Sequence, residues 1–143
     1  MSWTGGPWVA DTSAWARAAT PEVADRWTEA ARAGDLFGCP IVTLELLYDA
    51  RDAEAVEQVA TGLAGLRQAP VNRSVTDAAV AAIRELAALG AARSHRVRIA
   101  DALIAAAAAD RGLGVLHYDH HFDRLSGVLD FVSEWVAPPG TVA

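Results

Sequence analysis

Short apolar runs alternate with helix-forming segments along this chain, and this alternation restricts the fold more than any other feature. Runs typical of buried strands occur at 7–11 ("PWVAD"), 36–42 ("LFGCPIV"), 114–118 ("GVLHY") and 128–132 ("VLDFV"), with a minimal one at 69–71. Apolar residues at helical spacing fill 21–34, 52–68, 76–89 and 98–111. Strands that alternate with helices favour a parallel sheet covered on both faces. We therefore predict a three-layer α/β/α domain with a mostly parallel central sheet.

The length of 143 residues fits a single domain that spans 1–143, with residues 138–143 expected to fray. The single cysteine, Cys39, excludes a disulfide within the chain and a cysteine-based zinc site. The amino terminus lacks the pattern of a signal peptide, and the longest apolar run is far shorter than the ~20 residues that span a bilayer. We expect a cytoplasmic protein without membrane association.

The chain contains no lysine, and all 12 of its basic residues are arginines. This absence excludes a P-loop and any chemistry that needs a lysine Schiff base. The net charge of −6 predicts no general attraction to nucleic acid. Binding of RNA would need a local arginine patch or a metal ion.

Acidic residues stand near the predicted strand ends, where ligands bind in open α/β sheets. Asp11 and Asp119 end the first strand and the "VLHY" strand, whereas Glu45 and Asp101 are expected in the first turns of helices. The helix that contains Glu45 is expected to begin at Thr43 as its N-cap. Taken singly, each acid could be a helix cap or a favourable partner of a helix dipole.

Taken together, these acids point to a metal. Asp11, Glu45 and Asp101 stand in apolar stretches, and buried carboxylates are rare unless they are paired or bound to metal. Like charges that converge at one sheet edge would raise one another's pKa unless a cation balanced them. Oxygen ligands select Mg²⁺ or Mn²⁺, and such a site suits hydrolysis of phosphodiester bonds.

The stretches "VADTSAW", "RIADALIAAAAADRG" and "VLHYDHHFDRL", with Glu45 between the first two, resemble a PIN domain of the VapC toxin type. The resemblance covers nearly the whole chain. It implies a ribonuclease that uses Mg²⁺ or Mn²⁺ and is the toxin of a toxin–antitoxin pair. It also implies a homodimer that a small VapB-type antitoxin silences.

The resemblance carries over residue by residue. The family's catalytic acidic quartet is matched by Asp11, Glu45, Asp101 and Asp119, of which Asp11, Asp101 and Asp119 are the implied metal ligands. Ser13 matches a hydroxyl that supports the first aspartate, while Thr12 is expected to pack or cap.

The final motif departs from the family pattern. Many relatives have Asp-x-Asp-Phe, whereas this chain has Asp119, His120, His121 and Phe122. His121 therefore stands where a second aspartate is common, and Asp123 could compensate or be a surface residue. This departure leaves the number of bound metals open.

His117 and an arginine cluster are further candidates near the acids. His117 shares a strand face with Asp119 and could bond to the acidic site, bind RNA or be a satisfied polar residue at the sheet edge. Arg93, Arg96 and Arg98, around His95, are candidates for contact with the RNA backbone. For Arg98, a solvated surface charge is the alternative.

Two other function classes bear on the same residues. A non-catalytic PIN-fold module that binds RNA or a protein would also fit the His121 departure. A phosphoryl-handling domain does not fit, because "DTSAW" lacks the second aspartate of aspartyl phosphatases and no lysine can steady a phosphoryl group.

Overall fold

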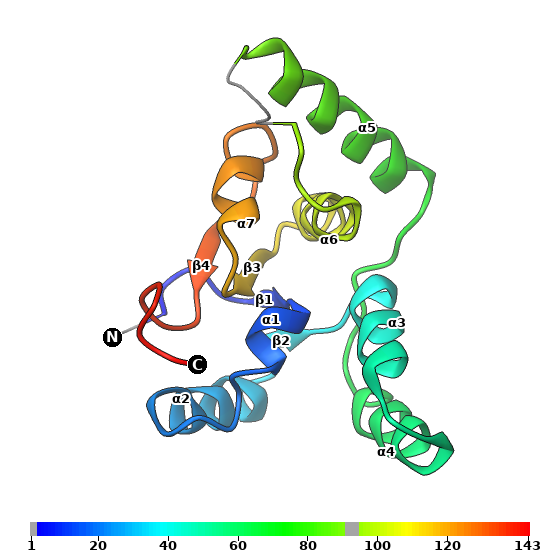
Figure 1. Ribbon diagram of the computed structural model, residues 1–143, viewed down its shortest axis with the longest axis vertical. Helices are drawn as coiled ribbons and strands as arrows, with labels where there is room; N and C mark the ends of the chain where they lie inside the picture. The colour runs from blue at the N-terminus through cyan, green and yellow to red at the C-terminus, as the bar shows by residue number, and fades with distance from the viewer. Residues whose placement is uncertain (1–2, 91–94) are drawn as a thin grey trace.

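The computed structural model describes residues 3–90 and 95–143, and a parallel sheet lies at its centre (Figure 1). Its strands are ordered β2-β1-β3-β4, and every neighbouring pair is parallel. This arrangement confirms the predicted three-layer fold. In chain order the elements are β1 (Trp8–Ala10), α1 (Thr12–Trp15), α2 (Pro21–Arg32), β2 (Leu36–Phe37), α3 (Pro40–Asp49), α4 (Ala53–Leu63), α5 (Arg73–Ala88), α6 (Ile99–Asp110), β3 (Gly114–His117), α7 (His120–Leu125) and β4 (Ser133–Trp135).

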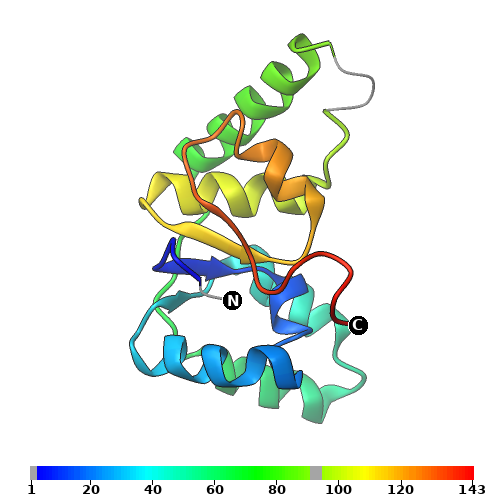
Figure 2. The same ribbon diagram turned by 90° about the vertical axis from the view of Figure 1, so that its left-hand side faces the viewer.

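Each face of the sheet has its own apolar core, because successive side chains of a strand point to opposite faces. Val9 and Val115 belong to one core, with the buried alanines of α6. Trp8 and Leu116 belong to the other, together with Trp27 of α2. Figure 2 shows α5, α6 and α7 on one side of the sheet and α2 on the other. The small side chains of α6 let this helix lie close against the strands.

The second predicted strand region is mostly wrong, because only Leu36 and Phe37 form a strand. The helix α3 begins at Pro40 with Cys39 as its N-cap, so Thr43 is not the cap. Proline favours the first helical position, since its fixed φ suits a helix and its missing N–H is not needed there. Glu45 consequently lies beyond the first turn of α3.

Two other strand predictions were also wrong. The last strand is Ser133–Trp135, whereas residues 128–132 precede it and contribute Val128 and Phe131 to the core. The minimal strand predicted at 69–71 is replaced by a single bridge between Gly38 and Gln68. These two apolar runs therefore marked segments that pack against the core rather than strands.

The carboxyl-terminal residues pass the end of β3. The Tyr118 hydroxyl donates to the Val142 carbonyl oxygen at 3.1 Å and accepts from the Val142 N–H at 3.3 Å. The fraying of residues 138–143 stays a prediction. Within residues 3–90 and 95–143, none of the helices combines the length and apolar character needed to cross a membrane.

Candidate metal centre

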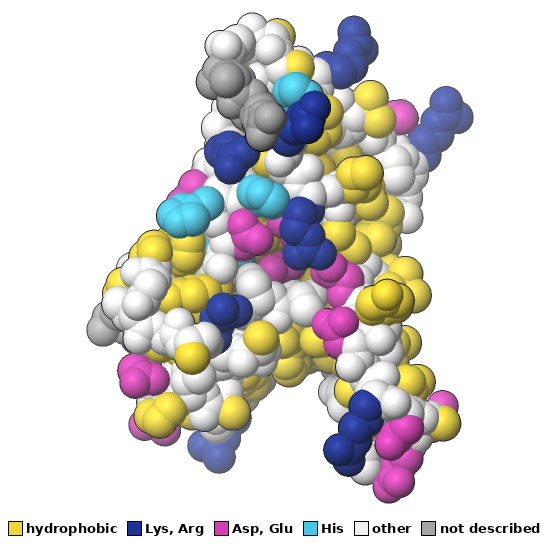
Figure 3. Space-filling model, viewed as in Figure 1, with side chains coloured by type: hydrophobic (Ala, Val, Ile, Leu, Met, Phe, Trp, Pro, Cys, Tyr) yellow, Lys and Arg dark blue, Asp and Glu magenta, His cyan; other side chains and the backbone are white. Residues whose placement is uncertain are grey.

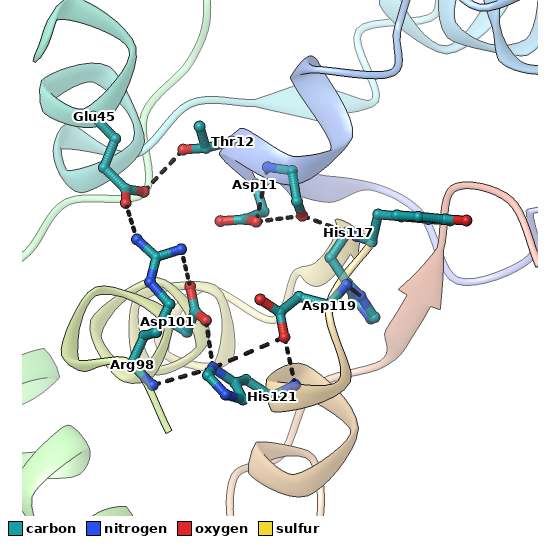
Figure 4. Close-up of polar contacts among 10 residues, drawn as sticks. Asp11, Thr12, Glu45, Arg98, Asp101, His117, Asp119 and His121 are labelled. Carbon is teal, nitrogen blue, oxygen red and sulfur yellow. Dashed lines mark hydrogen bonds and ion pairs between the residues drawn. The ribbon is translucent and has the colours of Figure 1, made fainter. Parts of the chain in front are cut away.

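The four predicted acids lie around the carboxyl ends of β1 and β3 (Figure 4). Asp11 directly follows β1 and caps α1, and Asp119 follows β3 and caps α7. Asp101 lies in the first turn of α6, and Glu45 lies on α3. On the molecular surface, acidic side chains appear in the middle of this face with arginine and histidine side chains beside them (Figure 3). The topology thus gathers carboxylates from separate segments.

Asp11 is buried and held from one side only. Its Oδ2 accepts from the Ser13 backbone N–H at 3.0 Å and from the Ser13 hydroxyl at 2.5 Å. Its Oδ1 is buried and has no hydrogen-bond partner among the described residues. Burial raises the pKa of Asp11, although the bonds from Ser13 oppose this and the charge of Glu45 adds to it.

Asp101 is fully buried. Its Oδ2 lies 3.0 Å from Nδ1 of His121, and its Oδ1 lies 3.9 Å from Nη1 of Arg98. That Oδ1 lacks a hydrogen-bond partner in the part of the chain that the structure describes. Burial, followed by the charge of Asp11, raises the pKa of Asp101 to about 6. The contacts with His121 and Arg98 only partly oppose this rise.

Glu45 lies at the edge of the site and already has two donors. The Thr12 hydroxyl donates to its Oε1 at 2.8 Å, and Nη2 of Arg98 donates to its Oε2 at 2.7 Å. The sequence interpretation missed the Thr12 contact, although the position of Thr12 next to Asp11 at a strand end could have suggested it. Arg98 therefore belongs to the site, whereas Arg96 is exposed and Arg93 lies outside the described residues.

Asp119 and His121 complete the centre. Oδ1 of Asp119 accepts from the His121 backbone N–H at 2.9 Å and lies 3.8 Å from Nδ1 of the same residue. Asp101, Asp119 and His121 can each offer one ligand atom, and these atoms lie within 4.8 Å of one another. This group differs from the predicted metal ligands, because it contains His121 in place of Asp11.

His117 and Asp123 lie behind this centre. His117 is fully buried, and its Nε2 lies 2.7 Å from the Ser133 hydroxyl. Burial lowers the pKa of His117 to about 4, against the charges of Asp123 and Asp119. The Asp123 carboxylate accepts from the Ser133 hydroxyl at 2.7 Å and from Nε1 of Trp135 at 3.0 Å. Asp123 thus bonds to β4, and it is not part of the group described above.

The residues present fit a divalent cation. Asp11 and Asp101 each keep a buried oxygen without a hydrogen-bond partner among the described residues, which is costly without a compensating charge. Carboxylate oxygens are the ligands that Mg²⁺ and Mn²⁺ take in proteins, and one imidazole nitrogen suits transition ions. A cation bound here would balance part of the negative charge of these acids.

Comparisons with known proteins show which proteins this chain is similar to. The sequence profile of the family described as "PIN domain" matches residues 9–128. Ribonuclease VapC18 of Mycobacterium tuberculosis H37Rv is 42% identical over 132 residues, covering 92% of this chain and 96% of that protein. Ribonuclease VapC51 of the same organism is 35% identical over 136 residues, covering 94% and 96%.

Among solved structures, the DNA-bound VapBC complex of Salmonella typhimurium contains a similar chain, with a TM-score of 0.70 at 18% identity. This match covers 91% of the present chain and 98% of that one. The FitAB complex bound to a DNA fragment gives a TM-score of 0.67 at 17% identity, covering 90% and 94%. At these identities the likeness concerns the fold.

Proposed function

The chain belongs to the PIN-domain family, among its VapC-type members, and we propose that it is a metal-dependent endoribonuclease that hydrolyses phosphodiester bonds of RNA. The observation that carries the proposal is the pair of buried, partly unsatisfied carboxylates, Asp11 and Asp101, at the strand ends. The printed names of the two mycobacterial relatives support the same reaction.

In this proposal Asp11, Asp101 and Asp119 hold Mg²⁺ or Mn²⁺. A bound ion would polarise the phosphate and lower the pKa of an attacking water. Ser13 keeps the Asp11 carboxylate oriented through its two hydrogen bonds. Glu45, partly exposed at the edge of the site, can accept a proton from that water.

Arg98 is the group best placed to meet a substrate phosphate. Its guanidinium is about half exposed and lies between Glu45 and Asp101. A guanidinium can donate two parallel hydrogen bonds to a phosphate. A hollow of about 560 Å³ next to it is lined by Thr12, Leu44, Glu45, Tyr48, Asp49 and Arg98. The exposed ring of Tyr48 offers a surface on which a base of single-stranded RNA can stack.

We also propose that the protein is the toxin of a VapBC-like module. It would be a homodimer in the cytoplasm, held inactive by a VapB-like antitoxin. The support comes from similar chains that occur in complexes titled VapBC and FitAB. Mapping the cut sites in total RNA after brief expression would identify the target.

Cleavage of RNA by the purified protein with Mg²⁺, with Mn²⁺ and with chelator tests the reaction. Wild type should cut only with metal, and Asp11→Asn and Asp101→Asn should lose at least about a hundredfold in rate, as expected when a catalytic metal is lost. Asp25→Asn, an exposed residue of α2, is the matched control and should cut normally. RNA that is bound but left intact with both metals would instead favour a non-catalytic binding module.

A further inference from the structure

We propose that the imidazole of His121 is a direct ligand of the metal, with Asp101 and Asp119, and that it makes the site prefer divalent transition ions such as Mn²⁺ over Mg²⁺. The inference rests on the metal-dependent function proposed above. It gives a role to His121, the position at which this chain departs from the oxygen-only pattern. An aspartate at this position would offer oxygen, whereas His121 offers nitrogen.

The spacing of the ligand atoms fits one ion. Nδ1 of His121 lies 3.0 Å from Oδ2 of Asp101 and 3.8 Å from Oδ1 of Asp119. Two ligand atoms that each lie about 2.1 Å from an ion, at a right angle, are about 3.0 Å apart. The three residues come from the start of α6, the end of β3 and the first turn of α7, and Figure 4 shows their side chains converging.

The state of the imidazole nitrogen also fits a ligand. The Arg98 backbone N–H donates to Nδ1 of His121 at 3.1 Å, which requires a lone pair on Nδ1. A metal needs the same unprotonated nitrogen. The same Nδ1 lies 3.0 Å from Oδ2 of Asp101, a separation at which one cation can contact both atoms. A cation between them would take both as ligands.

The buried carboxylate supplies an independent observation. Asp101 is fully buried, and its Oδ1 has no hydrogen-bond partner within the described ranges. Nη1 of Arg98 lies 3.9 Å from this oxygen, which is longer than a hydrogen bond. The carboxylate whose Oδ2 lies 3.0 Å from Nδ1 of His121 therefore also has a buried oxygen that no described hydrogen bond satisfies.

The donor set determines which ion is favoured. Mg²⁺ prefers oxygen ligands and keeps several waters, whereas transition ions accept imidazole nitrogen as well as carboxylate. Replacing His121 by aspartate would restore oxygen ligands only. The ratio of Mn²⁺ to Mg²⁺ affinity should then fall about tenfold or more. Substitutions of residues around a bound metal change affinity by this much.

Pulsed electron paramagnetic resonance of Mn²⁺ bound to the full-length, otherwise metal-free protein tests this directly. Wild type should show the modulation of a coordinated imidazole ¹⁴N, which changes to the ¹⁵N pattern when the histidines are isotope-labelled. This labelled wild type keeps the test independent of whether a variant folds. His121→Asp should lose the nitrogen signal, whereas His120→Asp, an exposed neighbour with the same change of charge, should keep it.

Each outcome separates the inference from the proposed function. Bound Mn²⁺ without nitrogen coupling, in a protein that cuts RNA, would overturn the ligand assignment and leave the nuclease in place. Nitrogen-coupled Mn²⁺ in a protein that leaves RNA intact would support the ligand and remove the proposed reaction. Failure to bind Mn²⁺ at all would overturn the ligand assignment, and cleavage of RNA with Mg²⁺ would then still leave the nuclease in place.

Discussion

The backbone N–H of Asp119 donates a hydrogen bond of 3.1 Å to Nδ1 of His117. Because Nδ1 accepts, the proton of this neutral ring is on Nε2, which donates to the Ser133 hydroxyl at 2.7 Å. Ser133 in turn donates to Asp123 at 2.7 Å. A chain of hydrogen bonds through the buried His117 thus ties the backbone of Asp119 to β4, which would make His117 a positioning residue for the proposed metal site.

Replacing His117 by phenylalanine should keep the ring stack with Phe122 and remove both nitrogens. The Asp119 N–H would lose its acceptor, so the free energy of unfolding should fall by about 1–3 kcal/mol. Mn²⁺ affinity should fall as well, because Asp119 would be less well held. His117→Asn, which keeps an acceptor oxygen, should recover part of both losses in urea unfolding and metal titration. Unchanged metal affinity in His117→Phe would contradict the positioning of Asp119.

The metal-free protein should show two opposing pH effects on stability. The pKa of His117 falls from its ordinary value of 6.5 to about 4 on folding, so its contribution is present above pH 6.5 and lost as the pH falls towards 4. The pKa of Asp101 rises from 3.8 to about 6, so its contribution is present below pH 3.8 and lost as the pH rises through 6. The two effects oppose each other in wild type between pH 4 and 6.5, and the raised pKa of Asp11 adds to the effect of Asp101.

Single variants should separate these effects. Asp101→Asn removes the stability that Asp101 gives at low pH, so its unfolding free energy should fall further than that of wild type as the pH drops from 6.5 to 4. His117→Phe should instead gain stability relative to wild type over the same interval. Urea unfolding at fixed pH values with chelator present measures both changes, and changes of the same sign relative to wild type in the two variants would refute the assignment.

Features set by local sequence were predictable. The run before Asp11 forms a buried strand whose aspartate caps the next helix, and Asp101 falls in the first turn of an alanine-rich helix as expected. Parallel strands place residues that follow them at one edge of the sheet, so the fold class alone was enough to predict that the acids lie close together. This part of the candidate site could therefore be predicted from the sequence.

Features set by tertiary contacts were not predictable. The strand at 128–132 was misplaced because Val128, Leu129 and Phe131 pack partly buried against the core without joining the sheet. The polar Ser133 and Glu134 pair with β3 instead. The hydrogen bonds of His117 depend on which residue of β4 faces it. Likewise, nothing local in the sequence indicates that the Arg98 guanidinium bonds to Glu45, which is 53 residues away.

Ser13 should be needed to hold Asp11. Ser13→Ala removes the hydroxyl that donates to Asp11 and that accepts from the Tyr118 N–H at 2.9 Å. Leaving that N–H unpaired should cost about 1–3 kcal/mol of unfolding free energy, and RNA cleavage should slow further because Asp11 is less constrained. Ser13→Thr keeps a hydroxyl and should retain more activity. Ser126→Ala, whose hydroxyl bonds only to the nearby Asp123 carbonyl among the described residues, is the control that should change little.

Removing the Arg98 side chain should strengthen metal binding and slow RNA cleavage. Its guanidinium lies beside Glu45 and Asp101 and repels an incoming cation, but it is about half exposed, so the effect is screened to about 1 kcal/mol. Arg98→Ala should therefore bind Mn²⁺ about threefold to tenfold more tightly, most clearly at low salt. RNA cleavage should nevertheless slow, because the phosphate loses its donor.

Arg96→Ala supplies the charge-matched control for Arg98→Ala. Arg96 is exposed in the same segment, and the same change of net charge there should leave Mn²⁺ affinity nearly unchanged, because exposed charges farther from the carboxylates are screened by solvent. Calorimetric titration of Mn²⁺ and cleavage rates at saturating metal separate the two effects. Weaker metal binding in Arg98→Ala would mean that Arg98 organises the carboxylates rather than competing with the cation, since loss of order would then outweigh loss of repulsion.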